Sequence, residues 1–418
     1  MNLYNKSFFN GAKLSQALLM LLGFSVPIST ALDNVLLALL LISGLIICGR
    51  DALKISYHNP VAQAAILLFG ILLIATLYGV TPFNEAVGIL GKYIDLAMIS
   101  LFIAVMRKNQ DRDNALNGFL LAMLFTLILS YLVGFGVLKA QSWMWPPTNV
   151  DNPAIFRHYL TQNTFMALAV FLALLRMRES ADTLKRFFWG AFALMGIINV
   201  LFMMMGRTGY IILLVFISWF AWTTLHRHLS SKNKPMDWRH VVAVMLLIVA
   251  SIAGAYSFSS RLQARVDLAI SELSAWKPGV RSNTSVGDRL EFYYNALQIS
   301  QQHPVAGVGT GGFYGAYEKQ AQGKNLWIVH NPHNEYLMIT VQTGLIGLSL
   351  LLYLFYTQWR YAPMLDSAFK QDAARGMVLA TMADCLFNSP LLDHAPGLLF
   401  ALMTATFYSK LKTDQRHG

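Results

Sequence analysis

Residues 115–137 read ALNGFLLAMLFTLILSYLVGFGV, an apolar run without a charged side chain. As an α-helix with a rise of about 1.5 Å per residue, this run would cross a bilayer core of about 30 Å. Similar runs recur along all 418 residues, of which 56% are hydrophobic and 13% charged, about half the usual charged share of a soluble protein. The sequence therefore predicts an all-α polytopic membrane protein. It excludes a cytosolic enzyme, a disordered chain and a disulfide scaffold.

We expect about 12 transmembrane helices. Their predicted ranges are 14–30, 33–49, 61–79, 86–106, 115–137, 161–177, 187–205, 208–225, 241–258, 336–357, 374–390 and 394–410. The fourth range contains Lys92 and Asp95, which we expect to share one helical face and to pair. The chain then divides into helices 1–9 over residues 1–258, an external loop over 259–335, and helices 10–12 with a short tail over 336–418.

The formal net charge of +11 raises the question of nucleic-acid binding. About two thirds of the 32 lysines and arginines, however, fall on the side of the predicted topology that carries both termini. Such an excess marks the cytoplasmic side of a membrane protein. We therefore expect cytoplasmic termini and membrane lipids as partners, with no nucleic acid.

Two external connections are long, over residues 138–160 and 259–335. Within the longer one, residues 261–275 and 287–303 carry apolar side chains at helical spacing. A structureless loop of this length would be unusual in a compact protein. We therefore expect a small, mainly helical cap that packs on the external face of the bundle.

Arginines on the external side are candidate ligands for an anion. Arg207 lies in the turn Gly206-Arg207-Thr208-Gly209, where the positive-inside bias disfavours arginine, although a snorkelling residue is the simpler explanation. A guanidinium group binds phosphate bidentately. The long loop adds further arginines with few acidic neighbours, which form either a solvated face or an anion site: Arg261, Arg265, Arg281 and Arg289.

The loop also contains a glycine-rich stretch, in which Gly307, Gly309 and Gly312 match the pattern GxGxxG. No predicted strand precedes it and no βαβ unit surrounds it, so a dinucleotide site is not expected. A tight backbone bend that serves the cap or a substrate site fits the glycines better.

Histidines precede the tenth predicted span in His330-Asn331-Pro332-His333-Asn334-Glu335. The pattern is not HExxH, and Pro332 prevents both histidines from lying on one regular helix, so we expect neither a metal nor another cofactor. A histidine that faces external arginines can instead act as a general base.

Polar residues also mark two other external edges, at 156–163 and 388–394. Each edge alone is more simply a cap or a turn. Taken with the loop, they supply the candidate substrate-binding residues Arg157, His158, Arg261, Arg265, His330, Asn334 and Asp393.

Together these residues resemble the O-antigen ligase (WaaL) family, within a superfamily that includes O-antigen polymerases and bacterial protein O-oligosaccharyltransferases. The resemblance runs from Asp288-Arg289-Leu290 through His303-Pro304 and Gly307-Val308-Gly309 to the stretch 333–337. Arg207 in its turn and the layout of spans also match. The resemblance implies a GT-C-like glycosyltransferase architecture in the bacterial inner membrane, with the active site on the periplasmic face.

The implied reaction transfers a polysaccharide from undecaprenyl-diphosphate-linked O-antigen to a sugar hydroxyl of the lipid A-core oligosaccharide, in lipopolysaccharide biosynthesis. The family's catalytic histidine corresponds to His333, and its two arginines correspond to Arg289 and Arg207. Asp393 is similar to an acidic residue that the family places near the last external turn.

The chemistry of these residue types fits such a transfer. Fixed arginines can stabilise a diphosphate leaving group without a metal, and a histidine, whose pKa is about 6.5 in water, can accept the proton of a hydroxyl. Direct displacement would invert the anomeric carbon. O-antigen polymerase, protein O-oligosaccharyltransferase and a non-enzymatic transporter of lipid-linked glycans remain alternatives, although transporters place their polar sites near the bilayer midplane.

Overall fold

The computed structural model describes residues 3–106, 109–146, 148–232 and 260–411, with scattered positions between 237 and 257. These residues form helices joined by loops, and their one extended pairing is an isolated bridge between Asn149 and Asn152. The all-α prediction is therefore confirmed for the part of the chain that the structure describes.

The helices of the first half coincide with the first eight predicted spans. They are α1 (Leu3–Ser25), α2 (Thr30–Tyr57), α3 (Pro60–Ile74), α4 (Phe83–Lys92), α5 (Ile94–Val105), α6 (Asn109–Gly134), α7 (Tyr159–Glu179), α8 (Thr183–Ile198), the π-helical turn η1 (Asn199–Met203) and α9 (Arg207–Ser231). The predicted span 241–258 lies largely outside the described residues.

The helices after residue 259 comprise the predicted cap and the last three predicted spans. They are α11 (Ser260–Ala275), α12 (Ser285–Gln302), α13 (Phe313–Ala321), α14 (Glu335–Tyr361), the 3₁₀ turn η2 (Ala362–Met364), α15 (Ala368–Asp384) and α16 (His394–Tyr408).

Five described helical segments are long and apolar enough to cross a bilayer, and the α4–α5 pair, bent by 45°, would make a sixth. The five segments are Gln110–Gly134, Tyr159–Glu179, Thr183–Met203, Arg207–Ser231 and Glu335–Met364. The chain is thus an all-helical protein with several membrane-capable helices. The larger number of about 12 spans stays a prediction.

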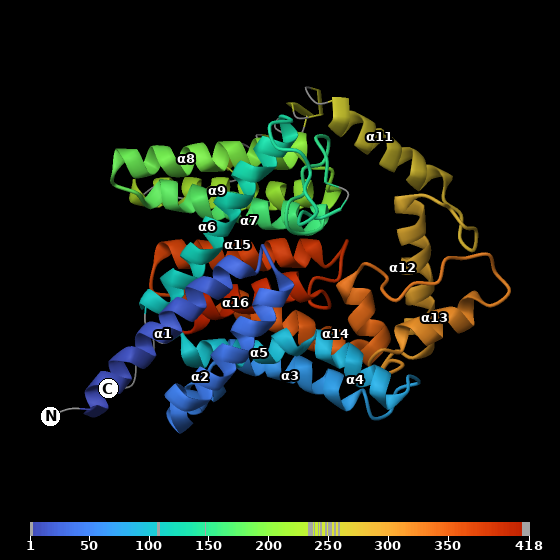
Figure 1. The fold of residues 1–418 in the computed structure, drawn as a ribbon. Coiled ribbons are helices and arrows are strands. Elements are labelled where there is room, and N and C mark those ends of the chain that lie inside the picture. The colour runs from blue at the N-terminus through green and yellow to red at the C-terminus, as the bar shows by residue number, and fades with distance from the viewer. Residues whose placement is uncertain are drawn as a thin grey trace.

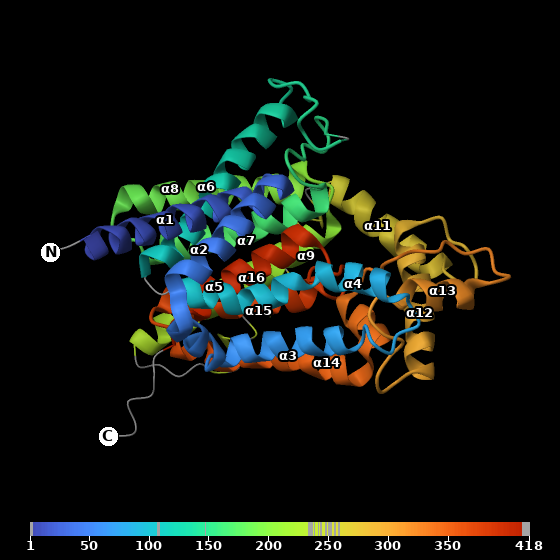
Figure 2. The same ribbon diagram turned by 60° about the horizontal axis from the view of Figure 1, so that its bottom comes forward.

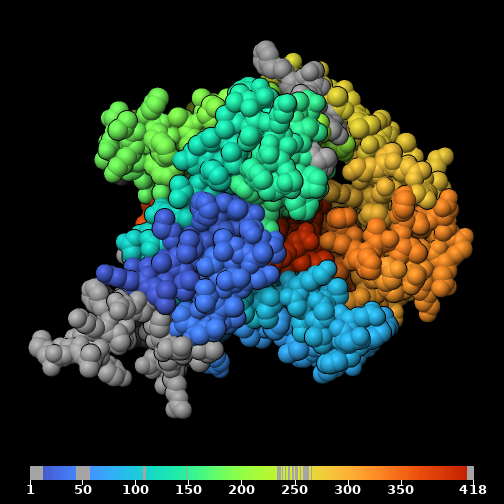
Figure 3. Space-filling model, viewed as in Figure 1, coloured from blue at the N-terminus to red at the C-terminus, as the bar shows by residue number. Residues whose placement is uncertain are grey.

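Most of the helices run along one common direction, and the cap helices α11, α12 and α13 gather at one end of the bundle (Figures 1 and 2). We call this end the cap end. The loop after α6 and the helix α4 lie at the same end, whereas α1 begins at the other (Figure 1). The space-filling view shows a recess between the cap and the bundle, with the red C-terminal region at its floor (Figure 3).

The cap contacts the bundle through α12, which packs against α14, but helix α11 leaves most of its apolar stripe exposed. Val266, Ile270 and Leu273 are 36%, 60% and 56% exposed, whereas the acidic Glu272 is only 8% exposed. Glu272 accepts one hydrogen bond, from the Val286 N–H at the start of α12, and pairs with Arg207 of α9. Helix α11 is therefore joined to α9 and α12 through Glu272 on its polar face.

Buried charges join the bundle helices at the end opposite the cap. Asp372 of α15 binds Arg178 of α7 and Arg227 of α9, at 2.5 and 2.8 Å. Breaking such a pair on one side leaves an uncompensated buried charge, which is strongly destabilising. These arginines therefore have a structural role in joining α7, α9 and α15.

The glycine-rich stretch is a backbone bend, as predicted, and it packs against a break in α14. Gly344 interrupts α14 with φ 64° and ψ −159°. Around this break the Val308 N–H donates to the Val341 carbonyl at 2.8 Å, and the Leu345 N–H donates to the Pro304 carbonyl at 2.8 Å. The loop between α12 and α13 is thereby tied to the middle of α14.

The predicted pairing of Lys92 with Asp95 is wrong. The helix breaks between them, at Tyr93, so α4 ends at Lys92 and α5 begins at Ile94 in a new direction. Asp95 is buried, and neither of its carboxylate oxygens has a hydrogen-bond partner among the described residues. Lys92 is exposed and interacts electrostatically with Asp393 instead.

We predict that Gly344→Ala destabilises the protein by roughly 2 kcal/mol or more, because only glycine adopts this backbone conformation readily. The added Cβ would also lie 2.1 Å from the Val305 carbonyl oxygen. Thermal unfolding in detergent measures the effect. Gly70→Ala in α3 is the matched control, since its Cβ would meet nothing within 4 Å. Equal midpoints for the two variants would contradict the prediction.

Candidate functional site

His333 lies in the tight turn that precedes α14. Its φ of 56° places it in the left-handed region, which is unusual for a residue other than glycine. Its N–H donates to Asn331 Oδ1 at 2.8 Å, and its carbonyl accepts from the Tyr293 hydroxyl at 3.0 Å. Helix α14 begins directly afterwards, because the Asn334 side chain accepts from the Leu337 N–H at 3.0 Å and caps it.

The turn between α15 and α16 supports the histidine turn from the other side. Ser389 Oγ donates to Asn331 Oδ1 at 2.8 Å, and Asn334 Nδ2 donates to the Leu386 carbonyl at 3.1 Å. The predicted spans 336–357 and 374–390 therefore meet at the cap end. The polar edge predicted at 388–394 forms part of the site's frame.

Glu335 joins this frame to α5. Its side chain is fully buried, and one carboxylate oxygen accepts from the Leu391 N–H at 2.8 Å. The other accepts from the Tyr93 hydroxyl at 3.2 Å. Glu335 is thus the support of the turn and is not available to a ligand.

Arg289 approaches His333 from the cap. It lies in the second turn of α12, which Thr284 caps by accepting from the Gly287 N–H. Burial, together with the positive charge of Arg289, lowers the pKa of His333 to about 4. The imidazole is therefore neutral at pH 7 and can accept a proton. Arg289 also interacts electrostatically with Asp384, at the end of α15.

Arg207 is the first residue of α9 and reaches the same end of the bundle. Its Nη1 lies 3.8 Å from Glu272 Oε2, and the same carboxylate oxygen accepts from the Val286 N–H of α12 at 3.0 Å. One buried carboxylate therefore links Arg207 to the helix that carries Arg289. The Arg207 side chain is 29% exposed, so part of its guanidinium remains open to an anion.

Arg157 is engaged by the protein. Its Nη2 lies 2.8 Å from Asp33 Oδ2, and its Nε and Nη2 donate to the Val26 carbonyl at 3.0 and 2.6 Å. It also contacts the Thr30 hydroxyl, and burial lowers its pKa. These bonds join the start of α7 to α1 and α2. Contact with substrate stays a prediction for this residue.

The other predicted binding residues lie at the cap end in different settings. His158 caps α7, burial lowers its pKa, and its ring meets Trp145 edge to face at 5.9 Å. His330 stacks on Tyr314 of α13 at 4.1 Å, and Asp393 begins α16. The predicted ligands Arg261 and Arg265 fall in α11, but their side chains lie outside the described residues.

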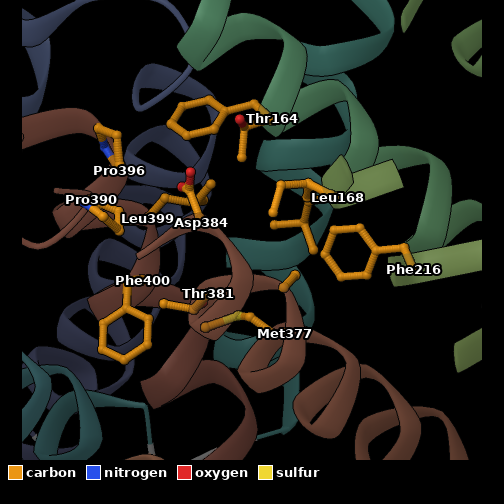
Figure 4. Close-up of a pocket in the computed structure, with 13 residues that line it drawn as sticks. Thr164, Leu168, Phe216, Met377, Thr381, Asp384, Pro390, Pro396, Leu399 and Phe400 are labelled. Carbon is orange, nitrogen blue, oxygen red and sulfur yellow. The ribbon is translucent and has the colours of Figure 1, made fainter. Parts of the chain in front are cut away.

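An apolar groove extends from Asp384 between four helices (Figure 4). It holds about 480 Å³, open mouth included, and Asp384 points into it beside Leu168 and Leu399. Its lining residues are Thr164, Phe165 and Leu168 of α7, Ile212 and Phe216 of α9, Met377, Ala380, Thr381 and Asp384 of α15, Pro390, and Pro396, Leu399 and Phe400 of α16.

Three residues of this arrangement were not singled out from the sequence as members of the site: Tyr293, Glu335 and Asp384. Asp384 had a signal, because an acidic residue inside a predicted span usually has a function. Glu335 belongs to the quoted histidine stretch, but its role, like that of Tyr293, comes from contacts with distant parts of the chain. Among the residues that the structure describes, no three His, Cys, Asp or Glu side chains are grouped so that they could hold a metal ion.

Comparison with known proteins gives one family match. The sequence model of a protein family described as O-antigen ligase matches residues 191–352, from α8 through the cap helices into α14. The matched segment contains Arg207, Arg289 and His333. No curated protein sequence matches the chain. The match supports a relationship of this chain to the O-antigen ligase superfamily and a glycosyltransferase-like activity of the ligase or polymerase type.

We predict that the half-buried, neutral His333 makes the fold less stable in acid. Its pKa in the folded protein is about 4, below the value of about 6.5 expected in an unfolded chain. Between these two values the unfolded state binds more protons, so the free energy of unfolding falls as the pH falls through this range.

Thermal unfolding at pH 7 and pH 5 tests this prediction with His333→Asn, because asparagine tolerates a positive φ and does not titrate. The midpoint of the variant should fall less between the two pH values than that of the wild type. An equal fall in both proteins would show that His333 does not contribute.

Proposed function

We propose that the protein is an O-antigen ligase. It transfers a polysaccharide from undecaprenyl diphosphate to a sugar hydroxyl of lipid A-core, on the periplasmic face of the bacterial inner membrane. The observation that carries the proposal is the histidine turn at the cap end, where α12 bonds to the His333 carbonyl through Tyr293 and brings the charge of Arg289 to a half-buried His333. In this proposal about 12 helices span the membrane. Both termini lie in the cytoplasm, because most of the basic residues fall on their side of the predicted topology.

The two arginines bind the diphosphate of the donor. When the bond between the anomeric carbon and the diphosphate oxygen breaks, negative charge develops on that oxygen. Guanidinium groups held in place by the protein stabilise this charge without reorganisation. Arg207 is held by Glu272, and Arg289 is held on α12, which the same carboxylate joins to Arg207.

His333 accepts the proton of the acceptor hydroxyl. The hydroxyl oxygen then attacks the anomeric carbon on the face opposite the diphosphate, and the new glycosidic bond has the inverted configuration. The products are the glycan joined to lipid A-core, undecaprenyl diphosphate, and the proton that His333 returns to solvent. A histidine base of this kind contributes roughly 10²- to 10⁴-fold to the rate.

The apolar groove provides a place for the isoprenoid chain of the donor. Its wall is apolar along four helices, and Asp384 at one end lies within electrostatic range of Arg289. Phe216 lies nine residues beyond Arg207 along α9, which corresponds to about 14 Å of helix. A chain in the groove would therefore leave its diphosphate beside the arginines.

O-antigen polymerase is the alternative that shares this donor site. It differs only in its acceptor, which is a second carrier-linked glycan instead of lipid A-core. The superfamily match covers both activities. The proposal of a ligase therefore rests on the resemblance of the motifs, and the experiment must identify the acceptor.

Complementation of a strain that lacks O-antigen ligase tests the proposal. The wild-type protein should restore the lipopolysaccharide ladder, whereas His333→Ala and Arg289→Ala should not, because each removes a group that acts in the transition state. In purified form, His333→Ala should ligate roughly 10²-fold more slowly or worse. Arg281→Ala is the control, since Arg281 belongs to the same loop but lies over the Trp327 ring at 3.6 Å.

The state of the carrier lipid separates ligase from polymerase. The uncomplemented strain should accumulate long polysaccharide on its carrier. If the wild-type gene leaves the ladder absent but restores polymer in a strain without polymerase, the protein is a polymerase. Full ligation by purified His333→Ala would remove the proposed base.

A larger side chain in the groove should weaken the binding of the donor. Ala380 is 4% exposed and lines the groove, so Ala380→Phe occupies space that an isoprenoid chain would take. We expect the donor KM to rise about tenfold, which corresponds to a loss of about 1.4 kcal/mol of binding free energy from apolar contact. The value of kcat should change little. Leu194→Phe is the control, because the Leu194 side chain on α8 is 59% exposed and lies outside the groove lining. An unchanged donor KM in folded Ala380→Phe would refute this use of the groove.

A further inference from the structure

Tyr293 connects three parts of the cap end through one hydroxyl group. It lies on α12, and its hydroxyl is 3.0 Å from the His333 carbonyl and 2.9 Å from the Leu386 carbonyl. A single O–H proton is shared between these two acceptors. The cap helix, the turn before α14 and the turn after α15 therefore meet at this atom.

Tyr293 also lies on the same face of α12 as Arg289. The two residues are four positions apart, which places their side chains one above the other on a helix. Both act on the histidine turn: the charge of Arg289 lowers the pKa of His333, and the Tyr293 hydroxyl donates to the His333 carbonyl. The position of α12 thus sets the distance of the arginine and the geometry of the histidine together.

The backbone of His333 needs support from outside the turn. A left-handed conformation is strained for a residue with a side chain, because the Cβ crowds the following carbonyl oxygen. In this turn both backbone groups of His333 are held: its N–H by Asn331 and its carbonyl by Tyr293. Without the tyrosine hydroxyl, one of the two constraints is lost and the peptide is free to rotate toward the extended region.

We propose that Tyr293 is a positioning residue for the transfer reaction, which holds His333 in its left-handed conformation and keeps the imidazole buried beside Arg289. The proposal rests on the proposed function, in which His333 is the base. Tyr293 acts through the backbone of His333, and no contact with either substrate is required of it.

The charged and titratable groups near His333 come from every element of the site. They are Arg289 and Tyr293 on α12, Glu335 at the start of α14, and Asp384 at the end of α15, which faces Arg289. Burial raises the pKa of Tyr293, so its hydroxyl stays protonated and remains a donor at neutral pH.

The test uses Tyr293→Phe, which removes the hydroxyl and keeps the ring. The neighbouring Tyr294→Phe is the matched control, because Tyr294 is 37% exposed and its ring meets Trp276 at 6.3 Å. We expect kcat of purified Tyr293→Phe to fall about tenfold, the effect of about 1.4 kcal/mol. The donor KM should change less than about twofold, since the arginines remain.

The acid limb of the pH profile distinguishes positioning from a general loss of structure. In the wild type, kcat should fall as the pH drops through about 4, where buried His333 becomes protonated. Without the tyrosine hydroxyl the histidine turn is less constrained and the imidazole becomes more exposed. In Tyr293→Phe the midpoint of the acid limb should therefore shift to higher pH, toward the pKa of about 6.5 of a histidine in water. Asn331→Ala, which frees the other backbone group, should move the limb in the same direction.

Three outcomes would overturn the proposal: a wild-type kcat in Tyr293→Phe, a reduced kcat with an unmoved acid limb, or an equal effect of Tyr294→Phe. The His333→Ala protein separates this failure from that of the proposed function. If His333→Ala is inactive and Tyr293→Phe behaves as the wild type, only the role of Tyr293 is lost. If His333→Ala ligates normally, the proposed base fails as well.

Discussion

The contact between the glycine-rich loop and the break in α14 is the constraint on which the site depends. Backbone N–H and carbonyl groups of residues 304–309 bond directly to α14 on both sides of Gly344. This contact anchors the end of α12, and α12 in turn packs against α14. Arg289 and Tyr293 therefore face the turn that contains His333. A backbone this close leaves no room for side chains, which explains the glycines.

Arginines have two kinds of environment in this protein. At the end opposite the cap, Arg178 and Arg227 share Asp372 and join three helices. At the cap end, Arg207 meets its carboxylate at 3.8 Å and is partly open, while Arg289 faces a neutral histidine. Closely paired cations stabilise the bundle, whereas incompletely paired ones retain the capacity to bind an anion.

Much of the architecture was predictable, because hydrophobic runs report helices directly in a membrane protein. The runs at 115–137 and 161–177 correspond to α6 and α7. Predictions from local spacing did less well: Lys92 and Asp95 were expected to pair, but the chain bends at Tyr93 and separates them. The spacing of α11 also did not reveal which of its residues is buried, since Glu272 is buried whereas Val266, Ile270 and Leu273 are exposed.

The sequence by itself determined the helical class, the apolar segments, the resemblance to a family and the residue types of the site, because these follow from composition, periodicity and motifs. Only the tertiary structure decided how His333 is held. Its positive φ, its burial and its nearness to Arg289 result from contacts with Tyr293 and the turn at Leu386. Such contacts join residues about 40 to 90 positions apart, and no local pattern specifies them.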